Sequence, residues 1–176
     1  MAPLYNQKTL NSSIEFTGVG LHTGEGVHMV IEPAKINHGV KFQRIDLENQ
    51  PILPADINLV TDTQRSTTLE KDNVKIVTVE HLMSALYALG VNNVLIKMDS
   101  SEVPILDGSA KCFVEKIQKV GLKIQDALLK YSKSSILFNI LGAILFKQNK
   151  FCHPICYLRL NKFDINLLII FFTRHQ

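Results

Sequence analysis

A chain of 176 residues is long enough for one full domain with a sizeable hydrophobic core, and its formal net charge is +3. The charge is uneven, with six Lys or Arg against one acidic residue in residues 132–176 and thirteen against fifteen in residues 1–131, so the first part is not a nucleic-acid binder by charge. Three cysteines beyond residue 110 form no disulfide framework, and no basic, apolar signal segment opens the chain, so we expect a cytoplasmic location.

The first predicted elements are two strands joined by a glycine-rich turn. Residues 9–16 alternate apolar and polar side chains, and residues 27–31 are rich in β-forming residues. The turn, residues 18–24, holds three glycines, which usually supply positive φ angles or close backbone approach. It is weak evidence for phosphate binding, because it lacks a Lys-Ser/Thr ending and no helix pattern follows. His22 at its centre either lines a site or is a polar residue on a hairpin.

Further strands are predicted over residues 40–45, 74–77 and 92–98, which are short runs of apolar and β-forming residues. The Thr- and Ser-rich residues 61–69 favour a strand with one polar side, which could face a substrate.

One helix, at residues 78–90, organises this part of the chain. Its apolar residues recur at steps of three and four, which gives one apolar face. Thr78 is predicted to be the N-cap and Gly90 the C-terminal stop. Glu80 and His81 then lie in the first turn, where aligned peptide dipoles favour an ionised carboxylate and a neutral imidazole. The pair is either a general base beside a metal-binding imidazole or a solvated helix start.

A second helix is predicted to run from a cap at Asp107 or Ser109 to Gly121, because its apolar residues are spaced four and three apart. Residues 1–126 are therefore predicted to form an α+β unit, a two-layer sandwich in which a mostly antiparallel sheet carries two helices on one face. The core is expected to contain Val79, Leu82, Leu86, Leu95, Ile96, Phe113 and Ile117.

The composition changes in the last part of the chain, for which we place a domain boundary at residues 126/127. Residues 132–176 contain twenty Ile, Leu or Phe but no Val and no Glu, and their apolar runs are too short or too interrupted for a membrane span of about 20 residues. Residues 152–156 contain two Cys and one His but lack a second pair at zinc-finger spacing, so we expect no zinc there. We interpret residues 127–176 as a poorly packed segment of the kind that out-of-frame translation of AT-rich DNA would produce.

Glu80 and His81 supply at most half of a hydrolytic metal site. A zincin helix needs a second histidine four residues after the first, and the inverted motif needs one four residues before, where Ala85 and Val77 stand. A catalytic zinc wants three protein ligands and an open position. The other histidines, at positions 22, 28, 38, 153 and 175, form no local pair that completes the set.

Three motifs nevertheless follow one another in the order and approximate spacing of one family. They are Gly-Val-Gly-Leu-His-Thr-Gly at residues 18–24, Thr-Val-Glu-His-Leu at 78–82 and Val-Pro-Ile-Leu-Asp-Gly-Ser at 103–109. With them, the chain resembles the first half of the UDP-3-O-acyl-N-acetylglucosamine deacetylases, the zinc amidases of lipid A biosynthesis, over residues 7 to about 125. Residues 127–176 are not expected to match.

The resemblance implies zinc-dependent removal of the N-acetyl group from UDP-3-O-acyl-N-acetylglucosamine. It implies that His81 is a Zn²⁺ ligand and that Glu80 is the base that deprotonates the metal-bound water. It places His22 near the mouth of the site, and the residues that would flank the substrate are Thr63, Gln64, Arg65 and Ser66.

The resemblance also implies a missing part. The family folds as two similar domains with the active site between them, and its second half supplies further zinc ligands, a catalytic histidine and lysine, and the passage for the acyl chain. Two functions follow as alternatives: the zinc deacetylase, or a truncated, catalytically inactive remnant that folds as a single α+β domain. A third, a binding module built on the same sheet, has only the fold in its favour.

Overall fold

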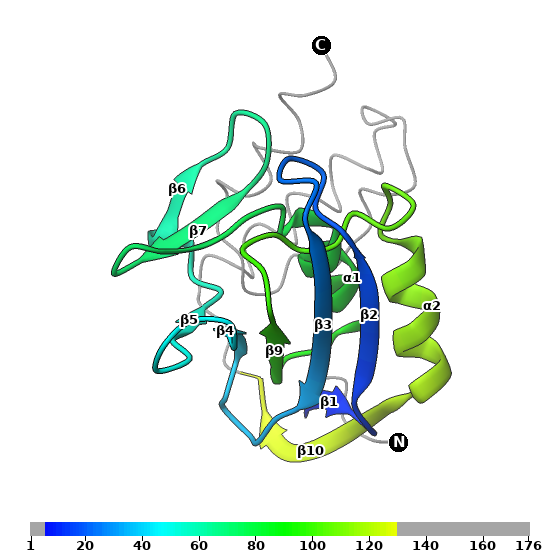
Figure 1. The fold of residues 1–176 in the computed structure, drawn as a ribbon. Coiled ribbons are helices and arrows are strands. Elements are labelled where there is room, and N and C mark those ends of the chain that lie inside the picture. Colours follow the sequence, from blue (N-terminus) through cyan, green and yellow to red (C-terminus); the bar gives the residue numbers. More distant parts are fainter. Residues whose placement is uncertain (1–5, 130–176) are drawn as a thin grey trace, which may run out of the picture. The chain divides into compact units, whose positions relative to one another are not determined.

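A five-stranded sheet forms the largest layer of the fold in the computed structural model, which describes residues 6–129 (Figure 1). The two smaller sheets contain two and three strands. In the large sheet, the parallel pair β4–β9 lies among neighbours that all pair antiparallel. Its strands, in spatial order, are β2 (Ile14–Val19), β3 (Gly26–Pro33), β9 (Val94–Met98), β4 (Val40–Arg44) and β5 (Ile52–Pro54).

One of the smaller sheets pairs strands from opposite ends of the described chain, and the other consists of strands that follow one another in sequence. One pairs β1 (Asn6–Leu10) with β10 (Leu122–Leu128) in antiparallel register, with Lys8 opposite Ile124. The other is an antiparallel meander of β6 (Val60–Asp62), β7 (Thr68–Lys71) and β8 (Val74–Ile76), preceded by the short 3-10 helix η1 (Ile57–Leu59). The first strand of the described chain therefore pairs with its last strand.

Two α-helices, α1 (Glu80–Leu89) and α2 (Lys111–Val120), pack against each other on one side of the large sheet (Figure 1). The Phe113 ring of α2 lies 5.0 Å from the Phe16 ring of β2, in the tilted arrangement that aromatic pairs prefer. Neither of these helices, the only α-helices among the described residues, is long and apolar enough to cross a membrane. The predicted α+β class, with mostly antiparallel strands and two helices, is confirmed.

The core prediction is confirmed for six of its seven residues. Leu95 is the exception and is only half-buried. Side chains alternate between the two faces of a strand, and β9 buries Val94, Ile96 and Met98, so Leu95 belongs to the opposite face. The single strand expected over residues 9–16 was also wrong, because β1 and β2 are separate strands that pair with different partners.

The helix ends confirm the predicted stops and contradict a predicted start. Gly90 ends α1 with a φ of 72° and donates its N–H to the carbonyls of Leu86 and Tyr87, as a left-handed C-terminal residue does. Gly121 follows α2 with a φ of 76°. Thr78 is not the N-cap of α1, because its own φ is 61° and its hydroxyl bonds to Glu102 instead.

The second helix start also differs from its prediction. Ala110 precedes α2 and provides no side-chain cap, so neither Asp107 nor Ser109 occupies the capping position. Ser109 Oγ accepts a hydrogen bond from the Lys111 N–H at 3.1 Å, while Asp107 Oδ1 accepts from Ser109. The two residues therefore order the turn before the helix and satisfy one amide of its first turn.

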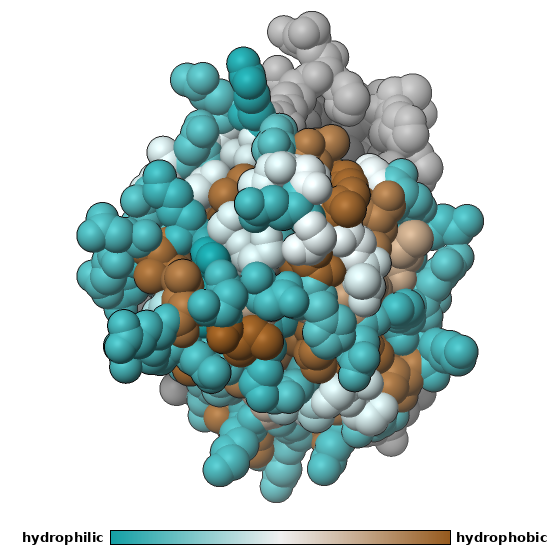
Figure 2. Space-filling model, in the orientation of Figure 1, coloured by the Kyte–Doolittle hydropathy of each residue, from teal (hydrophilic) through white to brown (hydrophobic). Residues whose placement is uncertain are grey.

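The outer surface carries few large apolar side chains. On the face shown in Figure 2, hydrophilic residues dominate and apolar residues form separate islands between them. Isolated apolar side chains of this kind are normal on a protein surface. Over the described chain, the exposed large apolar residues are Val19, Leu21, Ile36, Ile45, Ile52, Ile124 and Leu128.

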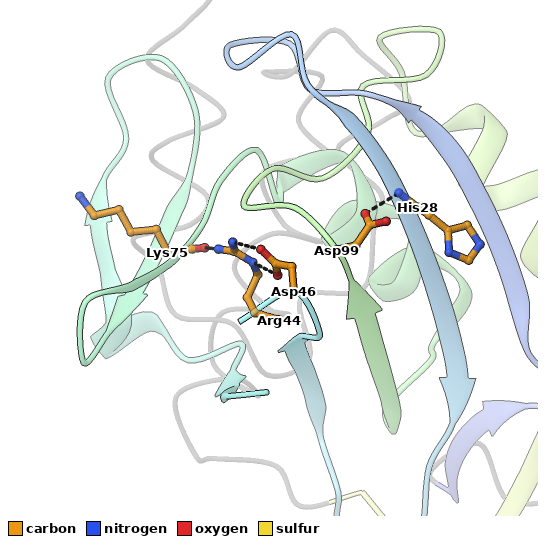
Figure 3. A network of polar contacts seen from close by, with 5 residues as sticks. All are labelled: His28, Arg44, Asp46, Lys75 and Asp99. Carbon is orange, nitrogen blue, oxygen red and sulfur yellow. Dashed lines mark hydrogen bonds and ion pairs between the residues drawn. The ribbon is translucent and has the colours of Figure 1, made fainter. Parts of the chain in front are cut away.

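A buried arginine fastens the end of β4 to the three-stranded sheet (Figure 3). Arg44 donates two hydrogen bonds to the Asp46 carboxylate, at 2.8 and 2.6 Å, and a third to the Lys75 carbonyl at 3.0 Å. The hydrogen bonds from Arg44 hold the pKa of Asp46 below its ordinary value. Close by, Asp99 accepts a 2.7 Å hydrogen bond from the His28 backbone N–H, which ties β3 to the end of β9 (Figure 3).

Replacing Asp46 with Asn should lower the free energy of unfolding by about 1–3 kcal/mol at pH 7, because the buried guanidinium of Arg44 loses its charged partner. The contribution of Asp46 is present above its ordinary pKa and is lost as the pH falls through the lowered folded pKa. The difference between wild type and variant should therefore shrink in acid. Urea unfolding at several pH values measures it, with the exposed Asp126→Asn as the control, and an equal difference at pH 7 and in acid would contradict it.

Candidate active site

The candidate active site is built on the first turn of α1, where Glu80 and His81 are the first two helical residues and are both half-buried. The Glu80 carboxylate accepts a 3.0 Å hydrogen bond from the backbone N–H of Thr67, and the Thr67 carbonyl accepts one from the Val79 N–H at 3.4 Å. This reciprocal pair holds the helix start against the residue that precedes β7. The partial positive charge of the helix N-terminus stabilises a carboxylate at this position.

The predicted substrate-flanking residues lie in the connection between β6 and β7 rather than in one continuous strand. Thr63, Gln64 and Arg65 are exposed, and Ser66 is buried. Because Ser66 directly precedes Thr67, the end of this connection lies beside Glu80. The structure thus brings one end of the predicted substrate segment to the predicted base.

His22 lies in the loop that joins β2 and β3, with an exposed side chain. Its backbone N–H donates to both carboxylate oxygens of Glu102, at 3.1 Å each, and Thr23 donates to the same carboxylate from its backbone N–H at 2.9 Å and its hydroxyl at 3.0 Å. The Thr78 hydroxyl donates to the other side of the carboxylate at 2.7 Å. Glu102 itself is fully buried, with 0% of its surface exposed.

Glu102 therefore joins the loop of the first motif to the residue that opens the second motif. Burial raises the pKa of Glu102, but the hydrogen bonds from Thr23, Thr78 and His22 outweigh it and lower the pKa below its ordinary value. The loop amides thus surround an anion that the chain itself supplies. This use of the amides explains the glycine-rich loop without a phosphate.

The segment that carries Glu102 also contacts the first motif and the residue directly before the second motif through its backbone. Ile105 donates its N–H to the Val19 carbonyl at 3.0 Å, and Val103 donates to the Val77 carbonyl at 3.0 Å. The third motif therefore lies between the β2–β3 loop and the entry to α1. The three motifs that are separated in sequence meet at one place in the fold.

A further prediction concerns Gly20, where an added Cβ would collide with Thr23 Oγ1 and the Glu102 carboxylate. Both groups are fixed by hydrogen bonds, so Gly20→Ala should break part of the set and lower the free energy of unfolding by about 1–3 kcal/mol. Gly26→Ala in the same hairpin is the matched control, since a Cβ there meets nothing within 4 Å. Thermal unfolding of both variants measures the difference, and equal stabilities would show that the loop accommodates the methyl group.

Glu102 is the residue of this site that the sequence analysis missed, together with the backbone of Thr67. A signal for Glu102 was present in the sequence, because it is an acidic residue directly before the apolar residues Val103 and Pro104, which the fold buries. An acidic residue next to a buried segment must find donors, and the nearby Thr residues supply them. The Thr67 N–H is a backbone group, so no pattern of side chains in the sequence indicates its role.

The described residues do not fit a complete zinc centre. Across residues 6–129, no group of three or more His, Cys, Asp or Glu side chains could hold a metal ion. His81 remains the one imidazole beside Glu80 in sequence, whereas a catalytic zinc needs three protein ligands. Cys152, His153 and Cys156 lie outside the described residues.

Comparison with known proteins agrees with the three motifs. The model of the family described as LpxC, UDP-3-O-acyl N-acetylglycosamine deacetylase, matches residues 7–169. A bifunctional enzyme LpxC/FabZ of Bacteroides thetaiotaomicron is 43% identical over 166 residues, which cover 94% of this chain and 35% of the relative. A UDP-3-O-acyl-N-acetylglucosamine deacetylase of Stenotrophomonas maltophilia is 48% identical over 124 residues, which cover 70% of this chain and 41% of the relative. One of Xanthomonas oryzae is 51% identical over 116 residues, which cover 66% of this chain and 38% of the relative.

The comparisons define how far the similarity reaches. The family model extends to residue 169, so the end that the motifs indicated, at about residue 125, was too early. The motifs could not show the extension because the last of them ends at Ser109. The chain spans about two fifths of the length of these curated relatives. With a family match over most of its length, the chain belongs to the LpxC family of UDP-3-O-acyl N-acetylglycosamine deacetylases.

Proposed function

We propose that this chain supplies the general-base part of a deacetylase that hydrolyses the N-acetyl group of UDP-3-O-acyl-N-acetylglucosamine in lipid A biosynthesis. The observation that carries the proposal is the position of Glu80, at the positive end of α1 with the Thr67 N–H on its carboxylate. A carboxylate held in this way is oriented by its hydrogen bond, which suits it to take a proton from an attacking water molecule.

The proposed roles of the other residues follow from their places around Glu80. His81 is the one described residue that we propose as a Zn²⁺ ligand, and the remaining ligands would come from outside the described residues. A bound zinc would polarise the acetamide carbonyl. His22 and the residues of the β6–β7 connection, Thr63, Gln64, Arg65 and Ser66, would contact the nucleotide-sugar substrate from two loops.

The domain limits remain part of the proposal. Residues 1–126 would form the first domain of the family, although strand β10 continues two residues beyond this limit to Leu128. Residues 130–176 lie outside the described part of the chain, so the interpretation of the tail stays a prediction. We further propose a cytoplasmic location, in line with the small number of cysteines.

A chimera tests the proposed function. The aligned 124 residues of the Stenotrophomonas maltophilia deacetylase would be replaced by the matching residues of this chain, and acetate release from UDP-3-O-acyl-N-acetylglucosamine would be measured. We expect turnover by the chimera and none by purified residues 1–176 with added zinc. A folded chimera without turnover would contradict the proposal and favour the inactive remnant, whereas turnover by residues 1–176 alone would show a complete site in this chain.

A further inference from the structure

We propose that Glu102 is a positioning residue, which holds the His22 loop (residues 20–25) and the entry to α1 as one unit. The proposal rests on the proposed function, because its purpose is to fix where His22 stands relative to Glu80 and His81. The hydrogen bonds that carry it, however, can be measured without any catalytic activity.

The first support is that the Glu102 carboxylate links two segments that are far apart in sequence. On one side, His22 and Thr23 are 80 and 79 residues away from Glu102, and together they donate from two backbone amides and one hydroxyl. On the other side, the Thr78 hydroxyl donates at 2.7 Å, two residues before Glu80. A single side chain therefore fixes the distance between the loop and the helix start.

The second support is the chemistry of the residue. Taking a carboxylate out of water is unfavourable unless good hydrogen bonds replace the water, and an apolar residue usually fills such a place with less penalty. A fully buried Glu102 with well-placed donors thus specifies a geometry rather than maximising stability. The lack of a side chain at Gly20 opens the space into which the carboxylate reaches.

The third support is the backbone of Thr78. A φ of 61° is uncommon for a β-branched residue, and such conformations persist where the surroundings hold them. The hydrogen bond to Glu102 and the neighbouring bond between the Val103 N–H and the Val77 carbonyl supply that hold. The strained turn delivers the chain into α1 at Glu80, so its conformation sets where the helix starts.

Amide hydrogen exchange and NMR chemical shifts of the ¹⁵N-labelled full chain test the linkage. Glu102→Gln keeps the shape of the side chain but replaces one acceptor oxygen with a donor group. We expect exchange at His22 and Thr23 at least tenfold faster, with exchange at Met29 and Ile96 in the large sheet unchanged within twofold. The exposed Glu115→Gln on α2 is the matched control and should change none of these amides.

Thr78→Val is the decisive second variant, and it tests the proposal even if Glu102→Gln does not fold. Valine keeps the branched shape and replaces the hydroxyl, which donates to neither His22 nor Thr23, with a methyl group. In this variant we expect the NMR signals of the His22 and Thr23 amides to shift and their hydrogen exchange to become at least threefold faster. Glu102 would transmit this effect, because the Thr78 hydroxyl bonds to Glu102 and to neither amide. When Glu102 is already replaced by Gln, Thr78→Val should cause no further change in the signals or the exchange of these two amides.

Two results of the exchange and chemical-shift measurements would overturn the proposal. Unchanged signals at His22 and Thr23 in Thr78→Val would show that the loop and the helix entry are independent. Equal acceleration of exchange across the large sheet in Glu102→Gln would show a general stabilising role instead.

In an active chimera, Glu102→Gln should lower kcat/KM at least tenfold without unfolding it, and an unchanged kcat/KM would remove the positioning role while leaving the proposed function standing. An inactive parent chimera would contradict the proposed function alone, because the exchange data decide the linkage.

Discussion

Replacing Glu80 with Gln should lower the kcat of the active chimera by about 10²–10⁴-fold, the usual contribution of a general base. The amide has the shape of the carboxylate and its oxygen can still accept the hydrogen bond from the Thr67 N–H, so the side chain should keep its place. It cannot take up a proton from water at neutral pH. The loss should therefore appear in turnover, with the affinity for substrate and metal little changed.

Steady-state kinetics of acetate release measure the effect, with Glu115→Gln in the same chimera as the control for a surface change of the same chemistry. His81→Ala should give a different pattern, because loss of an imidazole ligand weakens metal binding itself. A kcat of Glu80→Gln within threefold of the parent would show that another group takes the proton.

Leu86→Ala should lower the free energy of unfolding by about 2–5 kcal/mol, the range for a buried leucine whose removal leaves a cavity. Leu86 is 1% exposed and lies on the buried face of α1 together with Leu82 and Met83. Because α1 packs against α2, the cavity would open between elements that cannot easily close it.

Leu128→Ala is the matched control, since the same atoms are removed from a residue that is 66% exposed. Urea unfolding of the full chain and both variants measures the two differences. A change below about 0.5 kcal/mol for Leu86→Ala, the range of surface substitutions, would remove it from the core.

The sequence was sufficient for the elements whose signal is local. The apolar repeat of α1 and the glycine that ends it are carried by neighbouring residues, and both were predicted within two positions. Strand β4 was predicted over residues 40–45 and spans Val40–Arg44 for the same reason. The prediction for Leu95 was wrong because the packing of the helices decides which face of a strand is buried. The alternation of residues in the sequence does not reveal where the helices pack.

The candidate site was less accessible because its geometry depends on contacts between distant segments. Thr78 has the right residue type and place for an N-cap, but in the fold its φ is positive and its hydroxyl donates to Glu102, the residue directly before the third motif. Glu80 and His81 were identified from their order in sequence and their helical position. What orients Glu80 is a backbone amide of Thr67, thirteen residues earlier, which carries no sequence signal.

The pairing of β1 with β10 has a consequence for the order of folding during synthesis. Lys8 faces Ile124 across this pair, so the first described strand must wait until nearly the whole described chain has left the ribosome before it finds its partner. Until then the backbone groups of β1 that pair with β10 have no partner in the ladder, which is the situation in which strands associate with the wrong neighbour. The large sheet and α1 can form before this closure, since β9 follows α1 directly and completes the sheet by Met98. The β1–β10 ladder therefore joins the two ends of the described chain, and contacts of such long sequence separation slow folding.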